Sequence, residues 1–100
     1  MAEKRPAPEA MERLLRLLGL GVGGGLAVPG VDGTSALLAR GECRMVVVAN
    51  DASRRAVLKV VGAAKRAGVV VVDGPAATLL GSRLGKPPVM VVGVRDRALA

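Results

Sequence analysis

The basic residues between Arg40 and Arg66 are the side chains best placed to do chemistry in this chain of 100 residues. Arg55, Lys59 and Arg66 follow one another at intervals of four and seven residues, so they would lie on one side of a helix. A row of cations of this kind binds the phosphates of a nucleic acid. An ordinary solvated helix face can look the same, so the row alone leaves both interpretations open.

A second candidate lies at the start of the helix that we predict to begin near Gly30. The free N–H groups and the dipole of a helix N-terminus attract phosphate. Gly30 and Gly33 would let a nucleic acid approach the backbone closely. The same glycines also serve simply to shape a turn, and this alternative stays open too.

Side chains suited to enzymatic catalysis are scarce. The chain has no histidine and no tyrosine, so its single cysteine, Cys43, has no imidazole to activate it. One cysteine without histidine also excludes an intrachain disulfide and a Cys/His metal cluster. A turn or a helix cap accounts for each of the carboxylates Asp32, Asp51, Asp73 and Asp96. We therefore predict that the protein is not an enzyme and has no catalytic residues, no metal and no cofactor.

Two glycine patterns resemble nucleotide-binding motifs but lack their context. Gly19, Gly21 and Gly24 match G-x-G-x-x-G, yet a helix is expected before them and a short strand after them, which is the reverse of what a dinucleotide site needs. The segment 81–87 resembles a phosphate-binding loop, but it is one residue short and has Pro87 where a metal-binding Ser or Thr belongs. We expect no small-molecule substrate, and Lys86 stays available as a single phosphate contact.

Composition favours a polyanionic partner, because the net charge is +7 and the isoelectric point is near 11.1. Arginine is far more abundant than lysine, which suits phosphate and guanine contacts, although a base-composition bias could explain the excess as well. The absence of aromatic residues argues against modules that read single-stranded RNA by stacking. Any nucleic acid would be recognised through shape, backbone and base edges.

The elements that must position these residues follow from apolar periodicity and from the placement of glycine and proline. Residues 1–8 are expected to be a flexible tail, and residues 9–100 a single domain. Helices are expected at 9–20, 30–40 and 53–67, with Asp32 as the N-cap of the second and Ser53 as the N-cap of the third. A fourth helix should begin at 73–75 and end at Gly81 or Gly85, and a last helical turn is expected at 95–100.

Strands are expected at 26–28, 45–49, 69–72 and 88–92. The last three are continuous apolar runs, which are typical of strands covered on both faces. A helix between the second and third strands implies that those two strands are parallel. The sum is a three-layer α/β/α sandwich with a small sheet.

No segment predicts a membrane span. The longest uncharged run, Leu17–Val31, has 15 residues, contains six glycines, and is interrupted by Pro29, so it is too short and too broken to cross a bilayer. The first residues lead into a charged amphipathic stretch rather than a signal sequence. Together with the lone thiol, these features favour a cytoplasmic protein with no membrane partner.

Several motifs, in their order along the chain, resemble the ribosomal protein L-seven-Ae / L-thirty-e superfamily, and more narrowly its small bacterial ribosome-associated branch. The resemblance covers roughly residues 11–100. Its motifs are Leu-Leu-Gly-Leu at 17–20, the Gly30 helix, Arg40-Gly41, Val-Val-Ala-x-Asp-Ala-Ser at 47–53, Leu-Gly-Lys-Pro at 84–87 and Val-Gly-Val-x-Asp-Arg at 92–97.

The resemblance implies a mixed four-stranded sheet and binding of kink-turn or related RNA, with contacts from the Gly30 helix start and from the loop before the last strand. It implies RNA-binding residues at Gly30, Val31, Asp32, Gly33, Ala36, Arg40, Lys86 and Pro87. The family signature at the helix start is Gly, any residue, Asn, Glu, two residues, then Lys. This chain keeps Gly30 but has Asp32, Gly33 and Ala36 at the other three positions, and a carboxylate at 32 accepts hydrogen bonds but cannot donate them.

The sequence therefore predicts a non-enzymatic, ribosome-associated protein that recognises structured, kink-turn-like RNA, with ribosomal RNA as the expected partner. The alternative is a protein-interaction scaffold of the same fold that has lost specific RNA recognition. Gly33 and Ala36 suggest this alternative, because they stand where the family signature has Glu and Lys. The RNA target, the oligomeric state and the role of the Arg55, Lys59 and Arg66 row stay open at this stage.

Overall fold

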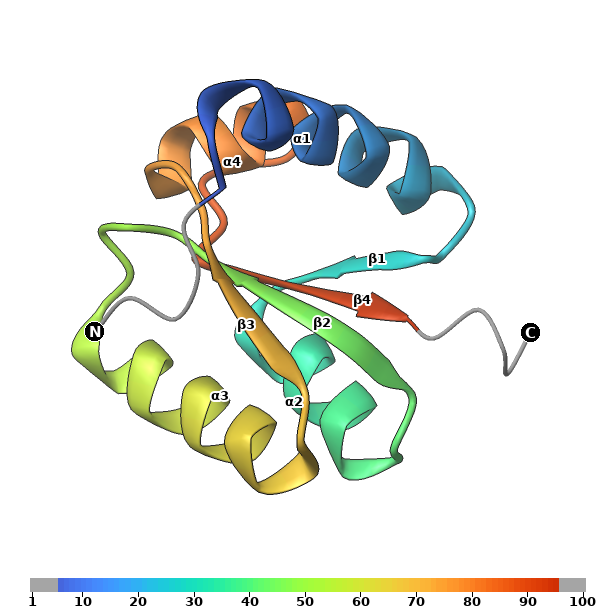
Figure 1. Cartoon of the computed structure of the whole chain (residues 1–100), viewed down its shortest axis with the longest axis vertical. Helices are drawn as coiled ribbons and strands as arrows, with labels where there is room; N and C mark the ends of the chain where they lie inside the picture. Colours follow the sequence, from blue (N-terminus) through green and yellow to red (C-terminus); the bar gives the residue numbers. More distant parts are fainter. Residues whose placement is uncertain (1–5, 96–100) are drawn as a thin grey trace.

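The valine-rich runs at 45–49, 69–72 and 88–92 form the centre of the molecule, as their two-sided apolar character predicts. The computed structural model describes residues 6–95 (Figure 1). In chain order, the elements are α1 (Pro8–Gly23), β1 (Ala27–Pro29), α2 (Val31–Ala39), β2 (Cys43–Val48), α3 (Arg54–Ala67), β3 (Val70–Asp73), α4 (Ala77–Arg83) and β4 (Val91–Arg95).

The strands form one mixed sheet in the order β1-β4-β2-β3. β4 runs antiparallel to both β1 and β2, and Gly93 pairs with Val28 on one side and Val46 on the other. β2 and β3 are parallel, with Val46 opposite Val71. The parallel pair around a helical connection and the mixed four-stranded sheet are both confirmed.

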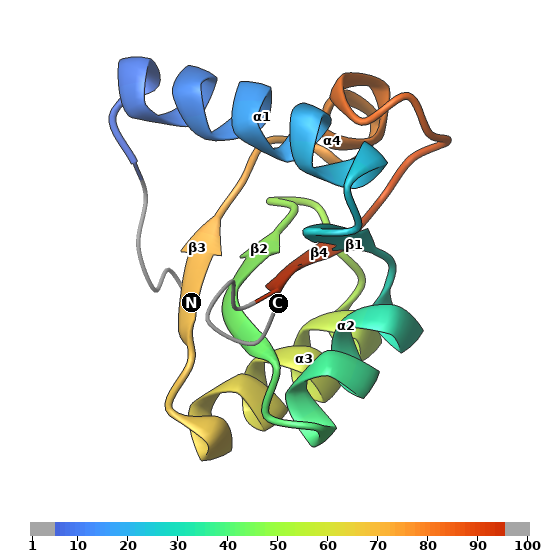
Figure 2. The same ribbon diagram turned by 90° about the vertical axis from the view of Figure 1, so that its right-hand side faces the viewer.

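Helices cover both faces of this sheet, which makes three layers (Figures 1 and 2). Val47 and Val92 point into the core under α1 and α4, together with Leu15, Leu18 and Leu80. Val46 and Val91 point into the opposite core, under α2 and α3, with Leu37 and Val60. The expected α/β/α sandwich is thus confirmed, and both cores are built from aliphatic side chains.

The first helix is longer than the sequence predicts, because it begins at Pro8 and continues through Gly19 and Gly21 to Gly23. Tertiary contact explains why these glycines do not end it. A β-carbon at Gly19 would lie 2.9 Å from the Arg83 carbonyl oxygen, so glycine lets α1 approach the end of α4. The expected helix end at residue 20 was therefore wrong.

Other expected boundaries shift as well, and the strands expected at 26–28, 45–49 and 69–72 lie one or two residues from those bounds. The last strand begins at Val91 rather than at 88. The Val89 N–H bonds to the Ala77 carbonyl of α4 instead of to the sheet, and Pro88 has no N–H to donate to a neighbouring strand. The fourth helix begins at Ala77, after Pro75. Arg95 belongs to β4, and the rest of the last helical turn expected at 95–100 lies outside the described residues.

The loop Ala49–Ser53 joins the two helical layers. Asp51 Oδ1 accepts the Ala77 N–H of α4 at 2.8 Å, and the Asn50 N–H donates to the Pro75 carbonyl at 3.0 Å. Ser53 caps α3 as predicted, because its Oγ accepts the Ala56 N–H at 3.1 Å. This five-residue loop therefore fixes the start of one helix in each layer.

No helix within residues 6–95 has both the length and the apolar character needed to cross a bilayer.

Candidate nucleic-acid interface

The start of α2 depends on Gly30, whose φ of 103° and ψ of 155° belong to a region that only glycine occupies readily. The Gly30 N–H bonds to the Val91 carbonyl at 2.7 Å, which ties the helix start to β4. The Gly30 carbonyl accepts the Thr34 N–H at 3.1 Å and the Thr34 hydroxyl at 2.7 Å. Thr34 is fully buried, so these bonds hold the first turn rigidly.

No side chain caps α2. Asp32 was expected to be its N-cap, but Gly30 occupies that position and Asp32 lies in the first turn, so this expectation was wrong. The Asp32 side chain is 98% exposed and accepts a hydrogen bond from Lys59 of α3 at 3.5 Å. The N–H groups of the first turn therefore have no side-chain acceptor, which leaves the positive end of the helix dipole open to an anion.

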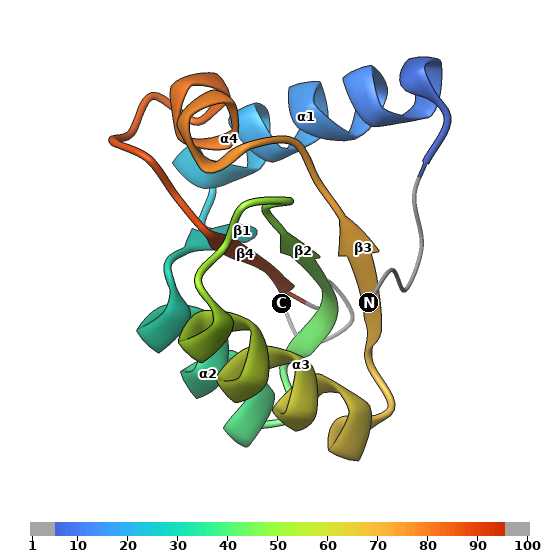
Figure 3. The ribbon, with the colours of Figure 1, turned by 90° about the vertical axis from the view of Figure 1, so that its left-hand side faces the viewer.

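The start of α3 lies next to the start of α2, because the two helices run in the same direction in their layer (Figure 3). Its first turn holds Arg54 and Arg55 and no acidic residue. Cations are unfavourable at this end of a helix, since the dipole is positive there as well. The Ser53 N–H contacts the Met90 sulfur at 3.5 Å, so the end of the α4–β4 loop closes the third side.

These three segments enclose a hollow of about 290 Å³ on the molecular surface. It is lined by Val31, Asp32, Ser53, Arg55, Ala56, Lys59 and Met90. Two helix N-termini, one arginine and one lysine meet there, against the single carboxylate of Asp32. The balance of charge and dipoles favours an anionic ligand with some apolar surface facing Val31 and Met90.

The Lys86 loop projects from the other helical layer on the same side of the molecule as the start of α2 (Figure 2). Lys86 and Pro87 are exposed, and neither lines the hollow. The Lys86 N–H bonds to the Gly81 carbonyl at 2.9 Å. A β-carbon at Gly81 would lie 2.1 Å from the Pro87 carbonyl oxygen, so the loop is packed tightly on α4 and presents Lys86 from a fixed backbone.

The structure separates the other residues that the sequence singled out. A β-carbon at Gly33 lies 2.5 Å from the Val28 side chain, so glycine here lets α2 pack against β1. Ala36 is one turn further along and half-buried. Arg40 is the C-cap of α2, and its Nε donates to Glu42 at 3.2 Å. Arg40 therefore lies at the opposite end of α2 from Gly30.

Catalytic chemistry finds no support among the described residues. Cys43 is buried, and burial raises the pKa of its thiol, so the nucleophilic thiolate is disfavoured. Its S–H donates to the Met45 carbonyl at 3.3 Å. Residues 6–95 contain no group of three acidic or cysteine side chains able to hold a metal ion.

Sequence reasoning missed Met90 as a member of the hollow and treated Ser53 only as a cap. Met90 is exposed between two buried valines, Val89 and Val91. That exposure cannot be read from a continuous apolar run. Ser53 and Met90 are 37 positions apart, so only the folded chain shows that they share a site.

The fold recurs in solved structures. A protein of unknown function from Bacillus halodurans is 24% identical, with a TM-score of 0.77 over 84% of this chain and 85% of that one. The Giardia lamblia 15.5kD RNA binding protein is 23% identical, with a TM-score of 0.81 over 94% of this chain and 80% of that one. At these identities the likeness establishes a common fold. The chain matches no protein-family model and, at a significant level, no curated protein.

Proposed function

We propose that this chain is a non-enzymatic RNA-binding protein of the L-seven-Ae / L-thirty-e superfamily, from its small bacterial ribosome-associated branch. It acts in the cytoplasm on structured, kink-turn-like ribosomal RNA. The observation that carries the proposal is the hollow where α2 and α3 begin together, with Arg55 and Lys59 at its edge. The fold shared with the Giardia lamblia RNA binding protein supports it.

In this proposal, Gly30 and Val31 bring the backbone N–H groups of α2 to an RNA phosphate or base edge. Gly30 is suited to this role because its lack of a side chain leaves the approach open, with no atom within 4 Å of an added β-carbon. Lys86 and Pro87 contact the same RNA from the α4–β4 loop. The separation of this loop from the hollow suits a ligand that is larger than one nucleotide and bent around the edge of the molecule.

Asp32 and Gly33 modify the recognition rather than abolish it. Lys59 partly neutralises the Asp32 carboxylate at the helix start, so the carboxylate can accept N–H groups of guanine with less repulsion of the backbone. Gly33 is committed to packing against Val28. Ala36 and Arg40 lie progressively further along α2, so their contacts would be to RNA that extends past the helix start.

A gel-shift titration tests the proposal directly. A kink-turn RNA and a plain duplex of the same composition are titrated at 50 and 200 mM salt. Three to four phosphate contacts predict that affinity falls roughly 40–150-fold between these concentrations, and that the kink-turn binds more tightly than the duplex. Absence of binding to either RNA at low salt contradicts the proposal.

The alternative, a protein-interaction scaffold, is favoured by one observation on the opposite face. An apolar groove of about 290 Å³ lies between α1 and the sheet, with Leu14, Leu17, Met45 and Val94 among its lining. Leu17 is 62% exposed and Leu20, on the same helix, 73%. Exposed aliphatic side chains next to a groove are typical of protein docking surfaces.

Ribosome association in cells separates the two functions. The scaffold predicts that Leu17→Glu with Leu20→Glu releases the protein from ribosomes, while charge reversal at Arg40 and Lys86 leaves it bound. RNA binding predicts the reverse. Co-sedimentation of each variant with ribosomes distinguishes them, after circular dichroism has shown that both variants are folded.

A further inference from the structure

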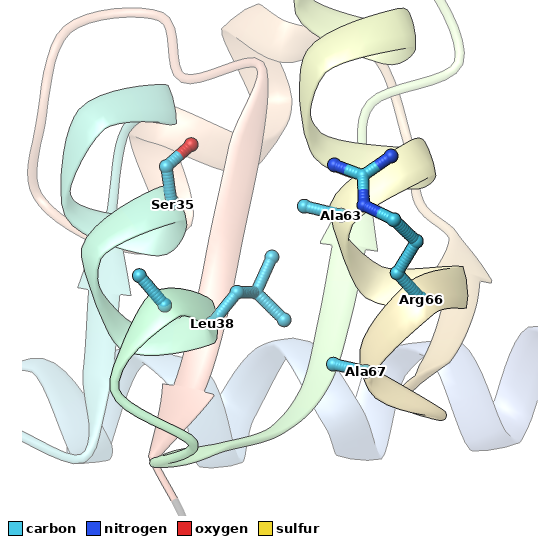
Figure 4. Close-up of a pocket in the computed structure, with 6 residues that line it drawn as sticks. Ser35, Leu38, Ala63, Arg66 and Ala67 are labelled. Atoms are coloured by element: carbon cyan, nitrogen blue, oxygen red, sulfur yellow. The ribbon is translucent and has the colours of Figure 1, made fainter.

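Arg66, the last member of the basic row of α3, lines a second hollow further along the same pair of helices. Its volume is about 330 Å³, and it lies between α2 and α3 (Figure 4). Its lining is Ser35, Leu38, Ala39, Ala63, Arg66 and Ala67. The Asp32–Lys59 ion pair bridges the two helices nearer their starts, in the lining of the first hollow. The two hollows therefore follow one another along the line where α2 and α3 face each other, and we refer to this line as the α2–α3 groove.

The cations of α3 follow this groove. At 100° per residue, Arg55, Lys59 and Arg66 fall within about 40° of one another on the helix surface, and they span about 16 Å along its axis. Arg55 and Lys59 line the first hollow and Arg66 the second. A stacked nucleic-acid strand carries one phosphate per roughly 3.4 Å, so the row matches the length of about five nucleotides.

Gly62 lies on the same side of α3 as the basic row, between Lys59 and Arg66. A β-carbon there would lie 3.4 Å from the Arg66 Nη1 atom, which shows that the guanidinium folds back over Gly62 instead of extending away from the helix. Figure 4 shows this side chain running along α3, with its guanidinium near Ala63. Neither Arg55 nor Arg66 has an ion-pair partner within residues 6–95.

Ser35 provides an independent indication of a ligand. Its hydroxyl oxygen is buried and has no hydrogen-bond partner in the described part of the chain, and Ser35 lies on the side of α2 that faces α3 (Figure 4). Buried hydroxyls are nearly always paired, and a serine within a helix commonly donates to the carbonyl four residues earlier. Here that bond is absent. A rotation about χ1 would offer the hydroxyl to a group lying in the groove.

We propose that the α2–α3 groove holds the sugar-phosphate backbone of an RNA strand that continues from the helix-start site. Arg66 contacts a phosphate, and the Ser35 hydroxyl bonds a phosphate oxygen or a ribose 2′-hydroxyl. RNA fits better than an acidic protein segment, because small side chains such as Ala39, Ala63 and Ala67 line the groove and leave no deep apolar pocket to anchor a protein side chain. This inference rests on the proposed function and adds the α2–α3 groove to the surface that contacts RNA.

The experiment uses the full chain and three RNAs. One is a minimal kink-turn, and the other two carry six additional nucleotides on one or the other strand end. The wild-type protein should bind one extended RNA about tenfold more tightly than the minimal RNA. Arg66→Gln should lose that gain and reduce the slope of log affinity against log salt by about one. Arg13→Gln, on exposed α1, removes the same charge from the opposite layer and should keep the gain.

Ser35→Ala gives a second readout, which a structural role would not produce. Removing an unpaired hydroxyl should leave the melting temperature of the free protein unchanged or raise it, while affinity for the extended RNA falls about fivefold. A lower melting temperature with unchanged affinity would overturn the role of Ser35, since it would place the hydroxyl bond inside the protein.

The remaining outcomes separate this inference from the proposed function. The minimal RNA could bind while neither extension tightens binding, or Arg66→Gln could behave as Arg13→Gln does. In either case the groove does not bind RNA, and the proposed site at the helix start is unaffected. If polyglutamate of equal charge competes as well as the extension does, the groove accepts acidic chains in general and the RNA assignment is wrong. If none of the RNAs binds, both proposals fail.

Discussion

The α1/α4 layer and the α2/α3 layer cover opposite faces of one sheet, yet they use arginine differently. In the first, Arg83 of α4 donates two hydrogen bonds to Glu12 of α1, so the charge holds two helices together. In the second, Arg55 and Arg66 face solvent beside hollows. An arginine that is already paired has little left to offer a ligand. The comparison teaches that an arginine indicates an anion site where it is both unpaired and beside a hollow, as Arg55 and Arg66 are.

The largest expected effect is on the free energy of unfolding, and we expect it to be similar in the two layers. Leu80 and Leu37 are buried in the α1/α4 and α2/α3 cores respectively, so Leu80→Ala and Leu37→Ala should each lower the free energy of unfolding by about 2–5 kcal/mol. Urea denaturation followed by circular dichroism measures both. If only one substitution destabilises the protein, the two layers do not contribute to a single cooperative fold.

Charge reversal tests the difference between the layers. Arg55→Glu with Lys59→Glu should weaken RNA binding roughly a hundredfold, because each change removes a phosphate contact and adds repulsion. Arg13→Glu with Arg16→Glu makes the same charge change on α1 and should weaken binding less than about tenfold through the long-range field. Fluorescence anisotropy at 100 mM salt provides the measurement. Equal losses in the two double variants would remove the distinction.

Asp32→Asn should strengthen RNA binding by roughly three- to tenfold. The substitution removes a negative charge from the helix start. It also frees Lys59, whose side chain pairs with Asp32 in the wild-type protein. Stability should fall by less than about 1 kcal/mol, since the pair is exposed and the loss is limited to the dipole interaction and a weak ion pair. The same anisotropy titration checks the affinity; weaker binding would mean that the hydrogen bonds the carboxylate accepts from guanine outweigh its repulsion of phosphate.

The smallest effect concerns the ion pair between α1 and α4. The hydrogen bond from Arg83 lowers the pKa of Glu12. A carboxyl whose pKa is lower in the folded state stabilises the protein above its ordinary pKa, near 4.3, and this stabilisation disappears as the pH falls through the lowered value. The melting temperature of Glu12→Gln should therefore lie slightly below wild type at pH 7 and match it near pH 3. A constant difference at both pH values would contradict this origin.

Local chemistry explains which parts of the fold could be predicted. The valine runs mark β2 and β3 because a strand covered on both faces needs apolar residues at consecutive positions. Ser53 marks the start of α3 because its hydroxyl completes the first turn from within the same segment. Gly41 ends α2 as expected, with a positive φ of 71°. Each of these features depends on neighbours within a few residues.

The misplaced features depend on distant neighbours. Gly19 stays helical because the end of α4 packs against it, and β4 starts late because Val89 bonds to α4 instead of to β2. The hollow combines Val31, Ser53 and Met90 from three separate segments. Nothing in the sequence near Met90 indicates that it lies beside Ser53, so the candidate site was only partly predictable.

The loop Ala49–Ser53 has a consequence for engineering the protein. Exposed loops are usually where a chain accepts an inserted residue or a new terminus, and Asp51 and Ser53 are both exposed. Yet Asp51 caps α4 while Ser53 caps α3, so one residue inserted between them would displace one cap or the other. We expect this loop to reject insertions that the glycine-rich turn at 23–25 would accept, and a fusion or circular permutation should therefore open the chain at the glycines.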